Sequence, residues 1–165
     1  MFPHLIEGDV APPFQLFDQD GHVHLLADYR GRWLVLFFYP RDATPGCTRE
    51  VCGFRDDILK IRALNAEVIG ISVDDTASHA RFATRHHLPF RLLADTKGHT
   101  AAAYGALFTF GPWHMARRHT FIVTPEGRVG HIFRQVKLAR HAAEVVRILE
   151  ELQMPNHADT LAIVQ

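Results

Sequence analysis

The sequence has few cysteines, a balanced charge and no long apolar run, and each of these limits the kind of protein it encodes. Only two residues are cysteine, and they do not form a C-x-x-C pair, which argues against a zinc site and against a thioredoxin-like disulfide reductase. Lysine plus arginine and aspartate plus glutamate number 18 each, without the basic excess of nucleic-acid-binding proteins. The strongest apolar run, residues 33–39, is far too short to span a membrane.

The N-terminus also lacks a targeting signal. Residues 1–10 contain Glu7 and Asp9 but no lysine or arginine, and they hold no apolar stretch of signal-peptide length. We therefore expect a cytoplasmic protein, and in that compartment two cysteines serve chemistry or redox sensing more often than a permanent disulfide. The twelve histidines are scattered without a metal-binding spacing, so we expect no metal site.

The order of apolar patterns predicts an α/β fold. With 165 residues, 47% of them apolar, the chain can bury a core and suits one domain, residues 1–165, better than two. Residues 33–39 and 67–73 are continuous apolar runs, which are typical of strands buried on both faces. Two short strands at 14–17 and 23–26, joined by a turn with aspartate and glycine, predict an N-terminal β-hairpin.

The remaining patterns complete a sheet with helices on both sides. Apolar residues at helical spacing predict one amphipathic helix over residues 47–64. We further expect strands at 91–94, 120–124 and 129–133 and helices at 76–87, 96–104 and 139–152. These helices should cover both faces of a central mixed β-sheet. The C-terminal tail, residues 154–165, fits no element, but its apolar residues favour packing on the domain or on a second subunit.

The segment between the buried strand and the first long helix carries the chemistry. Thr44 is a good N-cap and Pro45 suits the first helical position, which places Cys47 in the first helical turn. The unpaired amides and the helix dipole at that end favour negative charge, and therefore the nucleophilic thiolate. The position also follows the carboxyl end of a central strand, where open α/β sheets bind ligands. A small buried cysteine that merely begins a helix is the alternative.

The second cysteine, Cys52, follows Cys47 by five residues. On an ideal helix this spacing is about 140° around the axis and separates the two Cα atoms by roughly 8.6 Å. A disulfide needs Cα atoms closer than about 7 Å, so the two cysteines can bridge only if the helix unwinds. This fits a cycle in which a sulfenic acid on Cys47 condenses with Cys52 after local opening. A Cys52 that is merely buried remains the alternative.

The same residues resemble a known family. Pro40-x-x-x-Thr44-x-x-Cys47 matches the P-x-x-x-T-x-x-C motif of peroxiredoxins, and residues 38–56 resemble the bacterioferritin comigratory protein (PrxQ) branch. That branch places its resolving cysteine five residues after the peroxidatic one, as Cys52 is here. Flanking patterns agree at residues 8–14, 68–74 and 118–123. The resemblance implies a thioredoxin-like fold and reduction of hydrogen peroxide and alkyl hydroperoxides, without metal, flavin, haem or other cofactor.

The resemblance also assigns roles to individual residues. It implies that Thr44 orients the peroxide and the thiolate, that Pro40 shields the sulfur, and that Arg118 holds the thiolate and polarises the peroxide. A fixed cation near the thiol would also favour the thiolate and stabilise charge on the leaving oxygen. Arg117 is the competing candidate, but strand alternation sends it to the opposite face from Arg118.

In the predicted cycle, Cys47 becomes a sulfenic acid, Cys52 forms an intramolecular disulfide with it, and thioredoxin or a similar dithiol reductant restores both thiols. The alternative function is a redox sensor that uses the same cysteines, and turnover separates the two. We expect a monomer or weak homodimer with no nucleic-acid or membrane partner.

Residues 105–116 depart from the pattern of the branch because they are unusually apolar. Phe108, Phe110, Trp113 and Met115 could line a peroxide entrance, form a dimer contact or pack onto the core.

Overall fold

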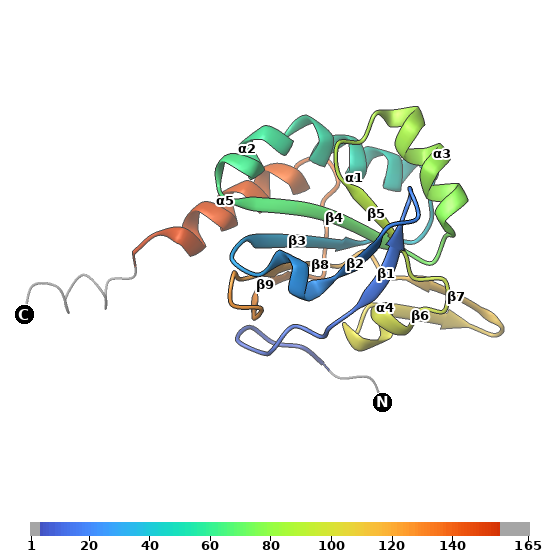
Figure 1. Cartoon of the computed structure of the whole chain (residues 1–165), viewed down its shortest axis with the longest axis horizontal. Coiled ribbons are helices and arrows are strands. Elements are labelled where there is room, and N and C mark those ends of the chain that lie inside the picture. Colours follow the sequence, from blue (N-terminus) through green and yellow to red (C-terminus); the bar gives the residue numbers. More distant parts are fainter. Residues whose placement is uncertain (1–3, 156–165) are drawn as a thin grey trace, which may run out of the picture.

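The computed structural model describes residues 4–155, and a seven-stranded mixed sheet lies at its centre (Figure 1). The sheet has the order β2-β1-β5-β4-β3-β8-β9. Its strands are β1 (Gln15–Asp18), β2 (Val23–Leu25), β3 (Trp33–Phe38), β4 (Ala66–Ser72), β5 (Arg91–Ala94), β8 (Thr120–Val123) and β9 (Val129–Phe133). β4 pairs in parallel with β3 and β5, and the other pairs are antiparallel. The predicted mixed sheet and the N-terminal hairpin are confirmed.

Helices cover both faces of this sheet. They are η1 (Leu26–Tyr29), α1 (Pro45–Asp56), α2 (Ile58–Ala63), α3 (Thr76–His86), α4 (His99–Ala103) and α5 (His141–Gln153). In Figure 1, α1, α2, α3 and α5 lie above the sheet and α4 lies below it. Alternate residues of β3 enter two cores, with Val35 and Phe37 on the side of α1 and Leu36 and Phe38 on the other. The continuous apolar run of β3 therefore reflects a strand buried on both faces.

The single helix predicted over residues 47–64 is wrong, because the chain forms two helices there. α1 ends at Asp56 and α2 begins at Ile58, with Asp57 between them at φ −100° and ψ 7°. The side chain of Asp57 makes no capping hydrogen bond to α2, but aspartate has a low intrinsic helix propensity, which makes a break at this position inexpensive. The sequence does not indicate this break, because the helical spacing of apolar residues continues across it: Phe54 and Ile58, on either side, both pack in the same core.

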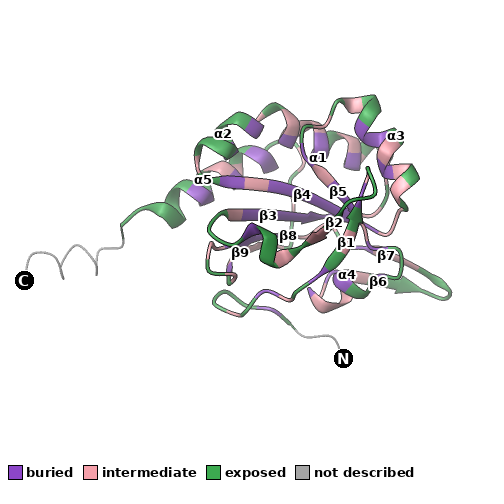
Figure 2. Cartoon of the chain, viewed as in Figure 1, coloured by how far each residue is buried: buried purple, intermediate pink, exposed green. Residues whose placement is uncertain are grey.

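A second hairpin, absent from the prediction, occupies most of the apolar segment before Arg117. β6 (Leu107–Phe110) and β7 (Trp113–Ala116) form a two-stranded sheet that, in the described part of the chain, is separate from the central sheet, and they extend from the body below α3 (Figure 1). Figure 2 shows that the hairpin is largely exposed. Phe110 and Trp113 face each other near its tip and are 70% and 62% exposed. Packing onto the core, one of the three expectations for this segment, is therefore wrong for these two rings.

No helix among residues 4–155 is long and apolar enough to cross a membrane. The predictions for the C-terminal tail concern residues that lie almost entirely outside the described part of the chain, which ends one residue after the exposed Met154.

Candidate active site

Cys47 lies in the first turn of α1, at the carboxyl end of the central strand β3. Thr44 is the N-cap residue with extended backbone, Pro45 is the first helical residue, and the amide of Thr48 donates to the carbonyl of Thr44 at 2.9 Å. The Cys47 side chain is completely buried. The local sequence thus forms the expected helix start, with the sulfur sheltered inside the protein.

The guanidinium of Arg118 contacts this sulfur directly. Arg118 belongs to the connection between β7 and β8, and its Nη2 donates to Cys47 Sγ at 3.3 Å. Burial opposes the charge on Arg118, but attraction to Glu50 and to Cys47 outweighs it and raises the pKa of the guanidinium above its usual value. A permanent cation beside the sulfur stabilises a thiolate and any negative charge that develops next to it.

The side chain of Arg117 lies against the β6–β7 hairpin. Its guanidinium carbon lies 5.3 Å from the centre of the Phe108 ring, on the β6–β7 hairpin, and its amide donates to the carbonyl of Ala106. Neither arginine lies within a strand, so the alternation invoked from the sequence does not apply as stated. The two side chains nevertheless diverge, and of the two it is Arg118 that reaches Cys47.

Sequence reasoning missed Glu50, which lies one helical turn after Cys47. Its side chain is buried, and Oε2 accepts from Arg118 Nη1 at 2.5 Å, while Oε1 has no hydrogen-bond partner within residues 4–155. Burial raises the pKa of Glu50 to about 7, although Arg118 acts in the opposite direction. Glu50 therefore orients Arg118 and exchanges a proton near neutral pH. A carboxylate at the i+3 position on the face of Cys47 is the signal that could have identified it.

Gly46 is a second residue that the sequence reasoning did not single out. A Cβ atom at this position would lie 3.1 Å from Arg118 Nη2 and 3.3 Å from Leu138 Cδ1. The absence of a side chain therefore leaves the space that the guanidinium occupies beside Cys47.

Two further predicted residues, Thr44 and Pro40, lie in the loop that leads into the helix. Thr44 does not cap α1 with its side chain, because its hydroxyl donates to the carbonyl of Arg41 at 3.0 Å. This leaves the hydroxyl oxygen with lone pairs to accept a hydrogen bond. Pro40 is half-buried in the same loop, directly after Tyr39, whose amide donates to Ile71 of β4.

Cys52 is half-buried in the same intact helix, and both cysteines are free thiols. Its sulfur lies 3.8 Å from Nδ1 of His86, on α3. Burial and the positive charges of neighbouring arginines lower the pKa of His86, so the imidazole is neutral at pH 7 and can accept the thiol proton. Because α1 is continuous from Pro45 to Asp56, a disulfide between the cysteines still requires it to unwind.

Two clusters of carboxylates and imidazoles have the spacing of a metal site among the described residues. They are Asp18, Asp20 and His22, and Asp42, Asp74 and His79. Their oxygens already accept hydrogen bonds within the protein: Asp18 accepts from two amides, and Asp42 accepts from Ser78 and His79. Neither cluster includes Cys47 or Arg118.

Comparisons with known proteins agree with this geometry. The model of the AhpC/TSA family matches residues 7–132. Peroxiredoxin Bcp of Bacillus subtilis is 39% identical over 149 residues, covering 88% of this chain and 95% of the relative. Peroxidoxin BcpB of Mycobacterium tuberculosis superposes with a TM-score of 0.86 at 31% identity, covering 92% of this chain and all of the other. Bacterioferritin comigratory protein of Xanthomonas campestris superposes with a TM-score of 0.79 at 30% identity, covering 84% of this chain and 90% of the other.

A thioredoxin-like sheet with a buried cysteine in the first turn of the helix after its central strand, touched by an arginine, defines a thiol peroxidase of the peroxiredoxin class. The resemblance drawn from the motif is confirmed on this point. The chain belongs to the AhpC/TSA family, among relatives named Bcp and peroxiredoxin Q.

Proposed function

We propose that this peroxiredoxin reduces hydrogen peroxide and organic hydroperoxides with Cys47 as the attacking sulfur. The observation that carries the proposal is the contact of 3.3 Å between Arg118 Nη2 and Cys47 Sγ in the first turn of α1. The bacterioferritin comigratory protein of Xanthomonas campestris is described as having alkyl peroxide reduction activity, which supports the inclusion of organic hydroperoxides.

In the first step the Cys47 thiolate attacks one oxygen of the peroxide, and the O–O bond breaks. Cys47 keeps the attacked oxygen with its hydrogen as a sulfenic acid, and the other oxygen leaves as hydroxide or alkoxide and takes a proton from solvent to give water or an alcohol. Arg118 stabilises the charge on the leaving oxygen. Thr44, whose hydroxyl proton is engaged by Arg41, accepts a hydrogen bond from the peroxide, and Pro40 shields the sulfur from solvent.

In the second step Cys52 attacks the sulfenic sulfur. Nδ1 of His86, 3.8 Å from the Cys52 sulfur, takes the thiol proton, and the sulfenic hydroxyl leaves as water once it is protonated. The resulting Cys47–Cys52 disulfide requires the first turns of α1 to unwind. A dithiol protein such as thioredoxin then reduces it by thiol–disulfide exchange. A reducing compartment such as the cytoplasm would supply that protein, and the peroxidase would act as a monomer or weak homodimer.

The deciding experiment measures peroxide consumption with thioredoxin, thioredoxin reductase and NADPH. We expect turnover in the wild type, none in Cys47→Ser, and a single fast oxidation without thioredoxin-supported turnover in Cys52→Ser. If Cys52→Ser turns over like the wild type, a thiol from another molecule resolves the sulfenic acid. If the wild type consumes no more peroxide than Cys47→Ser, the peroxidase function fails, and a sensor that reacts once becomes the better description.

A further inference from the structure

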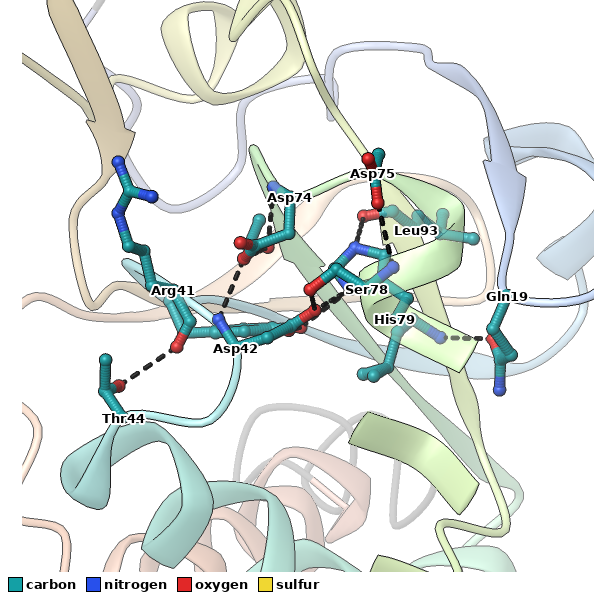
Figure 3. Close-up of polar contacts among 12 residues, drawn as sticks. Gln19, Arg41, Asp42, Thr44, Asp74, Asp75, Ser78, His79 and Leu93 are labelled. Atoms are coloured by element: carbon teal, nitrogen blue, oxygen red, sulfur yellow. Dashed lines mark hydrogen bonds and ion pairs between the residues drawn. The ribbon is translucent and has the colours of Figure 1, made fainter. Parts of the chain in front are cut away.

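A cluster of buried polar side chains links the loop that precedes Cys47 to a helix and a strand of the domain. At its centre are Asp42, in this loop, and His79, on α3, with side chains that are 4% and 0% exposed (Figure 3). Nδ1 of His79 lies 2.7 Å from Asp42 Oδ2, and its Nε2 lies 3.0 Å from the carbonyl oxygen of Leu93 in β5. One imidazole therefore joins the loop to both a helix and a strand.

The partners of this imidazole indicate that both of its nitrogens donate. The carbonyl of Leu93 can only accept, so Nε2 carries a hydrogen. Asp42 accepts from the hydroxyl of Tyr39 at 2.6 Å and from the hydroxyl of Ser78 at 2.8 Å, as expected for a carboxylate. Burial and the negative charge of Asp42 raise the pKa of Tyr39 well above its usual value, so that its hydroxyl keeps its proton and donates. This set of hydrogen-bond partners is the one that an imidazolium bound to a carboxylate would have.

The backbone of the same loop is also held in place. The amide of Asp42 donates to Asp74 Oδ2 at 2.8 Å (Figure 3). The hydroxyl of Ser72 donates to the same carboxylate oxygen at 2.6 Å. The next residue, Ala43, has φ 63°, in the left-handed region that residues with a Cβ atom seldom adopt. An unfavourable backbone conformation persists only where its surroundings impose it, and here Asp42 is fixed immediately before it.

We propose that His79 is a positioning residue of the peroxidase: as an imidazolium bound to Asp42 and Leu93 it fixes the Asp42–Thr44 turn, and thereby the first turn of α1 that presents Cys47. His79 acts through the loop, because its two ring nitrogens are both engaged by Asp42 and Leu93. The proposal rests on the proposed function for its effect on rate, but the charge state of the pair can be tested without any turnover.

The first test uses the wild-type protein in its reduced form. ¹⁵N NMR of labelled histidine reports which ring nitrogens carry protons. We expect both nitrogens of His79 to be protonated at pH 7, with assignment by comparison with His79→Gln. A neutral ring with one unprotonated nitrogen would overturn the ion pair, whether or not the protein consumes peroxide.

The second test measures the rate constant for the first oxidation of Cys47 by hydrogen peroxide, with rapid-quench thiol labelling. We expect His79→Gln and Asp42→Asn to lower this rate constant by about tenfold to a hundredfold, since small displacements of a reacting group have effects of that size. His99→Gln, which changes an exposed histidine at the start of α4, should react like the wild type. A folded His79→Gln or Asp42→Asn protein that reacts at the wild-type rate would overturn the proposal.

A rescue variant separates positioning from a general loss of stability. Glycine adopts positive φ without the cost that alanine incurs, so Ala43→Gly should restore part of the rate in the His79→Gln background. If His79→Gln does not fold, the same comparison is made in Asp42→Asn, which keeps the backbone bond to Asp74. Absence of any recovery would show that the loop conformation does not limit the reaction. If the wild type itself is inactive, the proposed function has failed, and the nitrogen shifts still decide the pairing.

Discussion

At the scale of single residues, the reactivity proposed for Cys47 depends on how closely Arg118, Glu50 and Gly46 pack around its sulfur. Arg118 contacts the sulfur with one nitrogen and Glu50 with the other, and Gly46 leaves the gap through which the guanidinium passes. The position of this cation is therefore set by packing as well as by charge, and packing can be changed without removing any charged group.

Gly46→Ala is expected to separate reactivity from stability. The added Cβ would crowd Arg118 Nη2 at 3.1 Å and shift it, so we expect the rate of Cys47 oxidation to fall by about tenfold. The stability should hold or rise, since alanine is the better helix former by up to about 1 kcal/mol. Rapid-quench oxidation and thermal unfolding measure the two effects.

Gly53→Ala is the matched control for this change. It lies in the same helix, and its new Cβ would meet only Ala142 Cβ, at an ordinary 3.8 Å. It should gain helix stability and keep the wild-type oxidation rate. Equal rates in the two alanine variants would mean that the exact position of Arg118 does not matter.

At the scale of elements, helix α3 holds both ends of α1. Near the start, His79 and Ser78 bind Asp42 in the preceding loop. Near the end, Nη1 of Arg55 donates to the carbonyl of His86 at 2.9 Å. In the proposed cycle, the unwinding that would bring the two cysteines together must therefore work against contacts with α3.

Arg55→Ala is expected to speed disulfide formation after oxidation. Loss of a hydrogen bond from this partly exposed arginine removes about 1 kcal/mol of the resistance to opening, or roughly fivefold in the opening equilibrium. Rapid acid quench and mass spectrometry after one equivalent of peroxide would follow the Cys47–Cys52 bond. Arg49→Ala, an exposed change in the same helix, serves as the control. An unchanged or slower rate in Arg55→Ala would show that this contact does not limit unwinding.

The sequence predicts elements well where one physical signal dominates and poorly where two compete. The runs of β3 and β4 are apolar because both faces are buried, and their pattern allows little else. The break at Asp57 was missed because the apolar period continues across it. The β6–β7 hairpin was missed although its apolar residues alternate with Thr109 and His114, because rings in that segment also fitted packing onto the core.

The candidate site was predictable to a similar extent. Pro40, Thr44 and Cys47 follow from a motif, and Cys52 and Arg118 follow from the wider resemblance to the family. The structure brings Arg118 to Cys47. The burial of Glu50 and the pairing of Asp42 with His79, 37 residues apart, depend on tertiary packing that no local pattern contains.

At the scale of the whole molecule, two buried titratable groups make the stability depend on pH with opposite signs. Burial raises the pKa of Glu50 from 4.5 to about 7 and lowers that of His141 from 6.5 to about 4. The folded state therefore holds the Glu50 proton more tightly than the unfolded state, and that contribution to stability is lost as the pH rises from about 4.5 to 7. The contribution of His141 is present above pH 6.5 and is lost as the pH falls toward 4.

Substitution of either residue should change how the free energy of unfolding depends on pH. Relative to the wild type, Glu50→Gln should gain stability as the pH rises from 5 to 8, by up to about 3 kcal/mol, because glutamine has no proton to lose. His141→Gln should show the opposite change, gaining relative stability as the pH falls from 7 to 5. Urea unfolding at several pH values measures both, with the exposed Glu150→Gln as a control. A Glu50→Gln curve parallel to that of the wild type would contradict the raised pKa.

The break at Asp57 has a consequence for how long the enzyme survives its own substrate. A cysteine sulfenic acid that is not captured by a second thiol can meet another peroxide and become a sulfinic acid, which the cell seldom reverses. Because α1 ends at the break, the unwinding that the proposed disulfide requires need not extend into α2. In the proposed cycle, resistance to permanent inactivation then depends on the stability of one short helix, which substitutions at its exposed positions can tune without disturbing Val51 and Phe54 in the core.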